Sequence, residues 1–136
     1  MSQTKLAFVA SQDETALQAK RELENKYAHV PENDADVVVV LGGDGKMLEA
    51  LRYYIDKPVK VFGMNKGTVG FLMNEFSSDN LLKRIEAATL VTLHPLRMHV
   101  ETSTGIIKEA LAFNEVSLLR ETSQTAKLRI TIDGTV

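Results

Sequence analysis

The sequence predicts an α/β fold: a parallel α/β sheet domain followed by the start of a second, all-β domain. Up to about residue 94, apolar runs rich in β-branched residues alternate with segments of helical periodicity, which is the pattern of a parallel sheet. Beyond that point only short strand-like runs separated by turn residues follow. We therefore expect an α/β domain over residues 1–94 and the beginning of an all-β, β-sandwich-like domain over residues 95–136.

The first strand and the first helix are predicted on either side of Ser11. Residues 6–9 are apolar and suit a strand, and Ser11 followed three residues later by Glu14 is the pattern of a capping box. Apolar residues recur along the helix at helical spacing, namely Ala16, Ala19, Leu23 and Tyr27. The helix should end before Pro31.

A second strand is predicted over residues 37–41, whose four valines and one leucine suit burial on both faces of a sheet. A periodic segment up to about Tyr54 predicts the next helix, and Pro58 separates it from a third strand over residues 59–62. The carboxyl ends of parallel strands lie at one edge, where ligands gather. The glycine-rich turns after the second and third strands should therefore face one ligand.

A short helix and several strands are predicted in the rest of the chain. Ser78 or Asp79 is expected to cap a helix that carries Leu81, Leu82 and Ile85. The predicted strands cover residues 96–101, 106–113, 116–119 and 128–132. Asp133 and Gly134 predict a hairpin turn with only two residues after it, so we expect the chain to be the front part of a longer protein. An open sheet edge would then be covered by a further segment or by self-association into a homo-oligomer.

Composition narrows the class of protein. A chain of 136 residues with 44% hydrophobic content can bury one sizeable core. Its 16 basic and 18 acidic residues include no basic cluster interleaved with aromatics, which argues against a nucleic-acid partner. The absence of cysteine excludes thiolate metal sites, and the apolar run near the N-terminus is too short for a leader or a membrane span. We expect a cytoplasmic protein with no membrane partner.

The turn after the second strand, residues 42–45, has the sequence Gly-Gly-Asp-Gly. Glycines let backbone N–H groups approach phosphate oxygens, and the N-terminus of the following helix adds favourable partial charge. Asp44 would then bind a metal or take a proton, because a bare carboxylate repels phosphate. The alternative is a simple loop in which Asp44 caps the helix.

A second glycine-rich loop is predicted over residues 63–72, where three glycines fall within eight residues and indicate unusual backbone geometry. One interpretation places Phe71 at the edge of the cleft against a flat ring. The alternative is a tight crossover in which Asn65 bonds its own backbone while Phe71 and Leu72 lie in the core.

Both motifs together resemble the NAD kinases, which make NADP from NAD and a phosphoryl donor. The first motif is shared with phosphofructokinases and with diacylglycerol and sphingosine kinases. The pattern Gly-x-Asn-x-Gly-x-x-Gly-Phe-Leu over residues 63–72 narrows the choice. A third match is Asn114 with Glu115, which is similar to the Asn-Glu pair that holds the nucleotide in that family.

The resemblance implies a phosphotransferase in which Asp44 is the catalytic residue and takes the proton of the 2′-hydroxyl of the adenosine ribose. It also implies that the second domain binds NAD. The implied nucleotide-binding residues are Gly42, Gly43, Asp44, Gly45, Phe71, Leu72, Asn114 and Glu115. The implied donor is ATP or polyphosphate with a divalent metal such as Mg²⁺, which would arrive on the donor, because no spacing of histidines or carboxylates predicts a metal site in the protein.

Two other functions remain open from the residues alone. A lipid or sugar kinase would share only residues 42–45, and a non-catalytic nucleotide-binding fragment would keep the site without turnover. Asn114 and Glu115 also have a structural alternative, a bulge or turn between two apolar strands. A chain that lacks the remainder of the enzyme is expected to be inactive if that remainder is needed for turnover.

Overall fold

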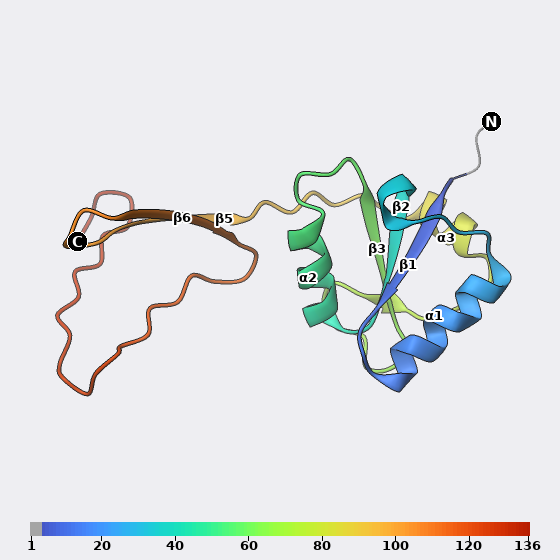
Figure 1. Cartoon of the computed structure of the whole chain (residues 1–136), viewed down its shortest axis with the longest axis horizontal. Helices are drawn as coiled ribbons and strands as arrows, with labels where there is room; N and C mark the ends of the chain where they lie inside the picture. Colours follow the sequence, from blue (N-terminus) through green and yellow to red (C-terminus); the bar gives the residue numbers. More distant parts are fainter. Residues whose placement is uncertain (1–3) are drawn as a thin grey trace. The chain divides into compact units, whose positions relative to one another are not determined.

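The computed structural model describes residues 4–136, which form two compact units divided between Leu93 and His94 (Figure 1). The first unit contains a parallel sheet of strand order β1-β2-β3-β4, which confirms the predicted α/β fold. Its strands are β1 (Leu6–Ala10), β2 (Val37–Leu41), β3 (Lys60–Asn65) and β4 (Asn74–Glu75). Residues 1–3, which belong to the segment expected to lack a leader, lie outside the described residues.

Strand β2 lies between β1 and β3, and all five of its residues are buried. Strand β3 continues three residues past its predicted end, because Val40 and Leu41 of β2 pair with Gly63 and Met64 and so extend the ladder. Strand β4 was not predicted, since two residues are too few to show a period of two.

Helices cover both faces of the sheet (Figure 1): α1 (Glu14–Lys26) and α3 (Leu81–Ala87) lie on one side, and α2 (Asp44–Tyr53) lies on the other. A short 3₁₀ turn, η1 (Glu32–Asp34), precedes β2. The core under α1 and α3 contains Leu6, Phe8, Ala16, Ala19, Leu23, Val37, Val39, Leu41, Phe62, Met64 and Leu81. The core under α2 contains Ala7, Val38, Val40, Met47, Ala50, Tyr54 and Met73.

The predicted capping box at Ser11 is wrong. The Ser11 N–H donates to the Leu41 carbonyl at 2.9 Å, so Ser11 still continues the ladder between β1 and β2 and cannot begin a helix. Asp13 is the N-cap instead, and its carboxylate accepts the Ala16 N–H at 2.9 Å. Hydrogen bonds from the Ser11 hydroxyl and the Ala16 N–H hold the pKa of Asp13 below its ordinary value.

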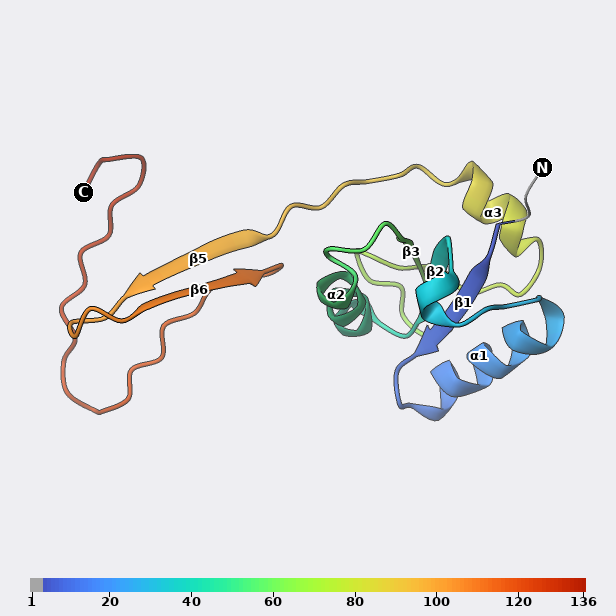
Figure 2. The ribbon, with the colours of Figure 1, turned by 45° about the horizontal axis from the view of Figure 1, so that its top comes forward.

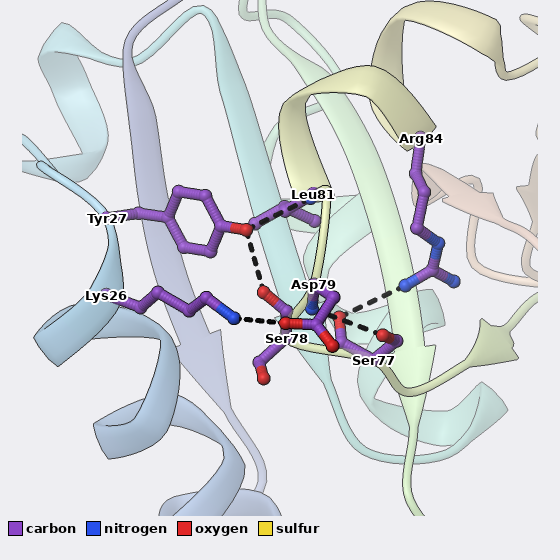
Figure 3. Close-up of polar contacts among 7 residues, drawn as sticks. All are labelled: Lys26, Tyr27, Ser77, Ser78, Asp79, Leu81 and Arg84. Carbon is purple, nitrogen blue, oxygen red and sulfur yellow. Dashed lines mark hydrogen bonds and ion pairs between the residues drawn. The ribbon is translucent and has the colours of Figure 1, made fainter.

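Helix α3 is capped by contacts from α1 and not by Ser78 or Asp79 as predicted. Its N-cap residue is Asn80, which has a φ of 54° and makes no side-chain cap. Figure 3 shows the Tyr27 hydroxyl between two backbone groups: it donates to the Ser78 carbonyl at 2.7 Å and accepts the Leu81 N–H at 3.1 Å. The Lys26 ammonium pairs with the Asp79 carboxylate beside it.

The second unit contains an antiparallel hairpin of β5 (Leu96–Glu101) and β6 (Ile107–Ala112), which Figure 2 shows as two long arrows. These strands match two of the predicted ones. The Asp133–Gly134 turn is confirmed, because both residues have positive φ, 49° and 82°, and Ile132 and Thr135 exchange two backbone hydrogen bonds of 2.8 and 2.9 Å.

The strands predicted over residues 116–119 and 128–132 are wrong: neither segment forms a strand in the structure, apart from the single bridge at Ile132. An apolar run becomes a strand only where a neighbouring edge pairs its N–H and carbonyl groups. No residue between 94 and 136, all of which are described, is buried. These runs therefore lack both a partner and a core.

Candidate functional site

The two glycine motifs meet at the carboxyl edge of the parallel sheet, as predicted. The first follows β2 and leads into α2, and the second begins within β3 and continues beyond it. The Gly42 N–H donates to the Met64 carbonyl at 3.2 Å, which joins the ends of the two strands.

Gly42 differs in its role from Gly43 and Gly45. It has a φ of +146°, which side chains disfavour, and an added Cβ would lie 2.7 Å from the Ser11 hydroxyl oxygen. A Cβ added at Gly43 or Gly45 would meet nothing within 4 Å. Gly42 therefore holds the turn, and the exposed Gly43 and Gly45 leave its outer side open.

Helix α2 begins with donors that are free to bind an anion. Gly43 is the N-cap, and its carbonyl accepts the N–H groups of Lys46 and Met47 at 3.1 and 3.2 Å. In the described part of the chain, the N–H groups of Gly43, Asp44 and Gly45 make no hydrogen bond. Such unpaired groups at a helix N-terminus are the usual ligands of phosphate oxygens.

Gly43 is the N-cap of α2 and Asp44 is its first residue, so the alternative of a simple loop in which Asp44 caps the helix is wrong. Its carboxylate does not turn back to its own helix. One oxygen, Oδ2, accepts the Phe71 N–H at 2.9 Å, and the other, Oδ1, accepts the Leu72 N–H at 3.0 Å. The carboxylate therefore joins the first motif to the second.

The second loop combines parts of both interpretations. Asn65 bonds its own backbone, because its Oδ1 accepts the Gly67 N–H at 3.0 Å and its Nδ2 donates to the Thr68 carbonyl at 2.7 Å. Leu72 is half-buried against the core under α2. Phe71 is not in the core: its side chain is fully exposed, with a relative accessibility of 101%.

The glycines of the second loop do not have the unusual backbone geometry that was predicted, since none of them has positive φ. Two of them have close neighbours: Gly63 faces the flexible ends of Met47 and Met73, and Gly70 faces the Asp44 carboxylate. A Cβ at Gly63 would lie 2.6 Å from the sulfur of Met73, and one at Gly70 would lie 2.6 Å from Cγ of Asp44. Gly70 was not predicted as a site residue, because spacing along the chain carries no sign of a contact with a residue 26 positions earlier.

Two lysines beside the motifs already have partners. The Lys46 ammonium lies 2.9 Å from a carboxylate oxygen of Glu49. The Lys66 ammonium lies 3.0 Å from Glu22 and 4.6 Å from the centre of the Phe76 ring. Neither ammonium is held ready for a donor phosphate in this conformation.

Asn114 and Glu115 lie in the second unit, two and three residues after the end of β6, and both are exposed. They do not form a bulge between paired strands, because the run after them is not a strand. Their predicted contact with the nucleotide stays a prediction.

Within residues 4–136, no three histidine, cysteine, aspartate or glutamate side chains gather closely enough to ligate a metal ion. None of the helices in that range is both long and apolar enough to span a bilayer.

Comparison with known proteins identifies the family of this chain. The family described as "ATP-NAD kinase N-terminal domain" matches residues 1–92. The chain is 50% identical to the NAD kinase of Hyphomonas neptunium and 51% identical to that of Brucella suis biovar 1, with all of this chain and 53% and 54% of the relatives covered. It is 51% identical to the NAD kinase of Caulobacter vibrioides, with 98% of this chain and 51% of the relative covered. The chain thus spans about half the length of these curated relatives, and it belongs to the NAD kinase family.

Proposed function

We propose that this chain is part of a phosphotransferase that converts NAD to NADP by phosphorylating the 2′-hydroxyl of the adenosine ribose. The chain supplies the residue that activates this hydroxyl. The observation that carries the proposal is the position of Asp44. Its carboxylate lies in the first turn of α2, beside unpaired N–H groups that suit phosphate, and two N–H groups of the second loop hold it in place.

In the proposed site the first motif binds phosphate. Gly43 and Gly45 have open space where side chains would be, so a phosphate can approach the N–H groups at the start of α2. Gly42 contributes by keeping the turn in its strained conformation.

Asp44 orients the acceptor hydroxyl. As the hydroxyl oxygen bonds to phosphorus and the donor's bridging oxygen leaves, the hydroxyl proton passes to the carboxylate. An ordinary carboxylate is a weak base for an alcohol, so most of its effect comes from positioning.

The remaining nucleotide contacts are assigned to Phe71, Leu72, Asn114 and Glu115. The full exposure of Phe71 supports its role, because an aromatic side chain with no packing of its own can stack on a flat ring. Asn114 and Glu115 are assigned to the adenosine on the family resemblance.

The donor is ATP or polyphosphate with Mg²⁺. The metal is assigned to the donor's phosphates, which the N–H groups at the start of α2 suit, because magnesium commonly binds through substrate phosphates and few protein ligands. When bound, the metal neutralises charge on the donor phosphates. We also propose a cytoplasmic location, in keeping with a chain free of cysteine, and a homo-oligomer.

Nothing in the structure or the relatives favours a lipid or sugar kinase. A non-catalytic nucleotide-binding fragment is the alternative that an experiment must separate.

The test is chromatographic detection of NADP after incubation with NAD, ATP and Mg²⁺. Two proteins are compared: the chain itself, and the chain joined to the C-terminal half of the Brucella suis relative. NADP is expected from the joined protein and from its Asp56→Asn control, in which an exposed carboxylate outside the site is replaced. Asp44→Asn should form no NADP while its far-UV circular dichroism is retained. Failure of the joined protein to form NADP would overturn the proposal, and NADP from Asp44→Asn would overturn the role of Asp44.

A further inference from the structure

Asp44 is held by a pair of consecutive backbone donors. Each of its two oxygens accepts one N–H, from Phe71 at 2.9 Å and from Leu72 at 3.0 Å. Hydrogen bonds to an ionised carboxylate are stronger than neutral ones, and two of them fix the plane of the group.

Gly70 makes this arrangement possible. Its φ is not positive, so the backbone conformation itself admits other residues. There is no room for a side chain at position 70, because an added Cβ would lie 2.6 Å from Cγ and 2.6 Å from Oδ1 of Asp44. A real Cβ does not approach carboxylate atoms this closely, so any side chain at position 70 must displace the carboxylate or the loop.

The carboxylate keeps acceptor capacity while it is held. A carboxylate offers about four lone-pair sites, and the two N–H groups occupy one on each oxygen. An incoming hydroxyl can therefore donate to Asp44 without breaking either bond.

We propose that Gly70 is a positioning residue: it admits the Asp44 carboxylate to a cradle formed by the N–H groups of Phe71 and Leu72, which aims the carboxylate at the acceptor hydroxyl. The acceptor hydroxyl is part of the proposed function, on which this role of Gly70 rests. The cradle itself rests only on the hydrogen bonds from Phe71 and Leu72. Because Phe71 itself donates one of the two bonds, the cradle also fixes the backbone that carries the exposed ring. The carboxylate and the Phe71 backbone are thereby held as one unit.

Gly67 offers a matched control in the same loop. Its φ is not positive, and an added Cβ would meet Oδ1 of Asn65 at 3.6 Å, an ordinary van der Waals contact. Gly67→Ala thus adds the same methyl group without reaching Asp44.

The first experiment measures hydrogen exchange of the Phe71 and Leu72 amides by NMR in the chain itself, without any substrate. Gly70→Ala should speed exchange at both amides about tenfold or more, as expected for loss of charge-assisted hydrogen bonds, while Gly67→Ala leaves both unchanged. Asp44→Asn provides a second variant should Gly70→Ala not fold. An amide has one acceptor oxygen, so one of the two N–H groups should lose its partner. Unchanged exchange at both amides in Gly70→Ala or in Asp44→Asn would overturn the cradle.

The second experiment measures kcat and KM for NADP formation by the joined protein. Gly70→Ala should lower kcat by about 10²-fold, the scale of a misplaced catalytic group, and leave KM for ATP near its parental value. A parental kcat in a variant whose amides have lost protection would overturn the positioning role. If the parent forms no NADP, the proposed function fails, and the exchange measurements still decide whether the cradle exists.

Discussion

Single glycines act in this chain by different physical means. Gly42 is required by its φ and by the closeness of Ser11, and Gly70 is required by the closeness of the Asp44 carboxylate. Gly63 faces the flexible ends of two methionine side chains, and Gly43 faces open space. A glycine-rich motif therefore contains both residues that hold the fold and residues that leave room for a ligand. Stability and binding measurements can separate the two kinds.

Gly42→Ala is expected to lower the free energy of unfolding by about 1–3 kcal/mol, because the alanine would be forced into a strained backbone conformation beside Ser11. The measurement is urea denaturation followed by circular dichroism. Gly67→Ala is the control and should lower stability by less than about 0.5 kcal/mol, since its φ is not positive and its Cβ would make only an ordinary contact with Asn65. Equal losses in the two variants would contradict the distinction.

At the scale of elements, α3 is held to α1 by polar contacts at its first turn. The Tyr27 hydroxyl replaces the side-chain cap that α3 lacks, and the pair of Lys26 with Asp79 lies next to it (Figure 3). These contacts join residues 51 to 54 positions apart along the chain. They therefore fix the start of a helix of only seven residues, which is too short to be stable alone.

Tyr27→Phe should cost about 1–3 kcal/mol of unfolding free energy, because the Ser78 carbonyl and the Leu81 N–H, both part-buried in these bonds, lose their partner. Urea midpoints measure the effect. Tyr53→Phe removes the same hydroxyl from a residue that is 60% exposed and serves as the control, with little expected change. An unchanged free energy of unfolding in Tyr27→Phe would show that α3 is held by its apolar side chains alone.

The pair of Lys26 and Asp79 should make stability depend on pH in a defined direction. The hydrogen bond and charge of Lys26 lower the pKa of Asp79 below its ordinary 3.8, and those of Asp79 raise the pKa of Lys26 above its ordinary 10.5. A lowered carboxyl pKa stabilises the fold above pH 3.8, and the contribution disappears as the pH falls through the lowered pKa.

Asp79→Asn should accordingly lower the urea midpoint slightly at pH 7, and the difference from the parent should shrink as the pH is taken to 3 and below. The effect is small because both groups are exposed. A difference that stays constant over this range would mean that Asp79 acts through something other than its charge.

At the scale of the whole molecule, the hydrophobic core is confined to the first unit. Every buried hydrophobic residue of the described chain lies between Leu6 and Leu81. The second unit consists of one hairpin and irregular segments with many exposed apolar side chains, among them Leu118, Leu119 and Ile130. An isolated two-stranded hairpin is marginally stable in water.

A fragment of residues 1–93 is therefore expected to unfold cooperatively in urea with nearly the same midpoint as the full chain, whereas residues 94–136 alone should show no cooperative transition. Circular dichroism of the two fragments measures both expectations. A large drop in the midpoint of residues 1–93 would show that the second unit contributes to the stability of the first.

Features that depend on local patterns could be predicted from the amino-acid sequence. The valine run of β2 predicted a strand buried on both faces, the alternation of strands and helices predicted a parallel sheet, and the two glycine motifs predicted the edge at which they meet. The two motifs also predicted the family, because the spacing of their residues can be recognised along the chain.

Features that depend on a partner far along the chain could be seen only in the folded structure. The predicted cap at Ser11 was wrong because Ser11 pairs with Leu41. The predicted strand over residues 116–119 was wrong because no strand edge pairs with that segment. The Asp44 carboxylate found its donors 27 and 28 residues later, where Gly70 left room for it. Periodicity reports which face of an element is apolar, whereas hydrogen-bond partners and free space between elements exist only after the chain has folded.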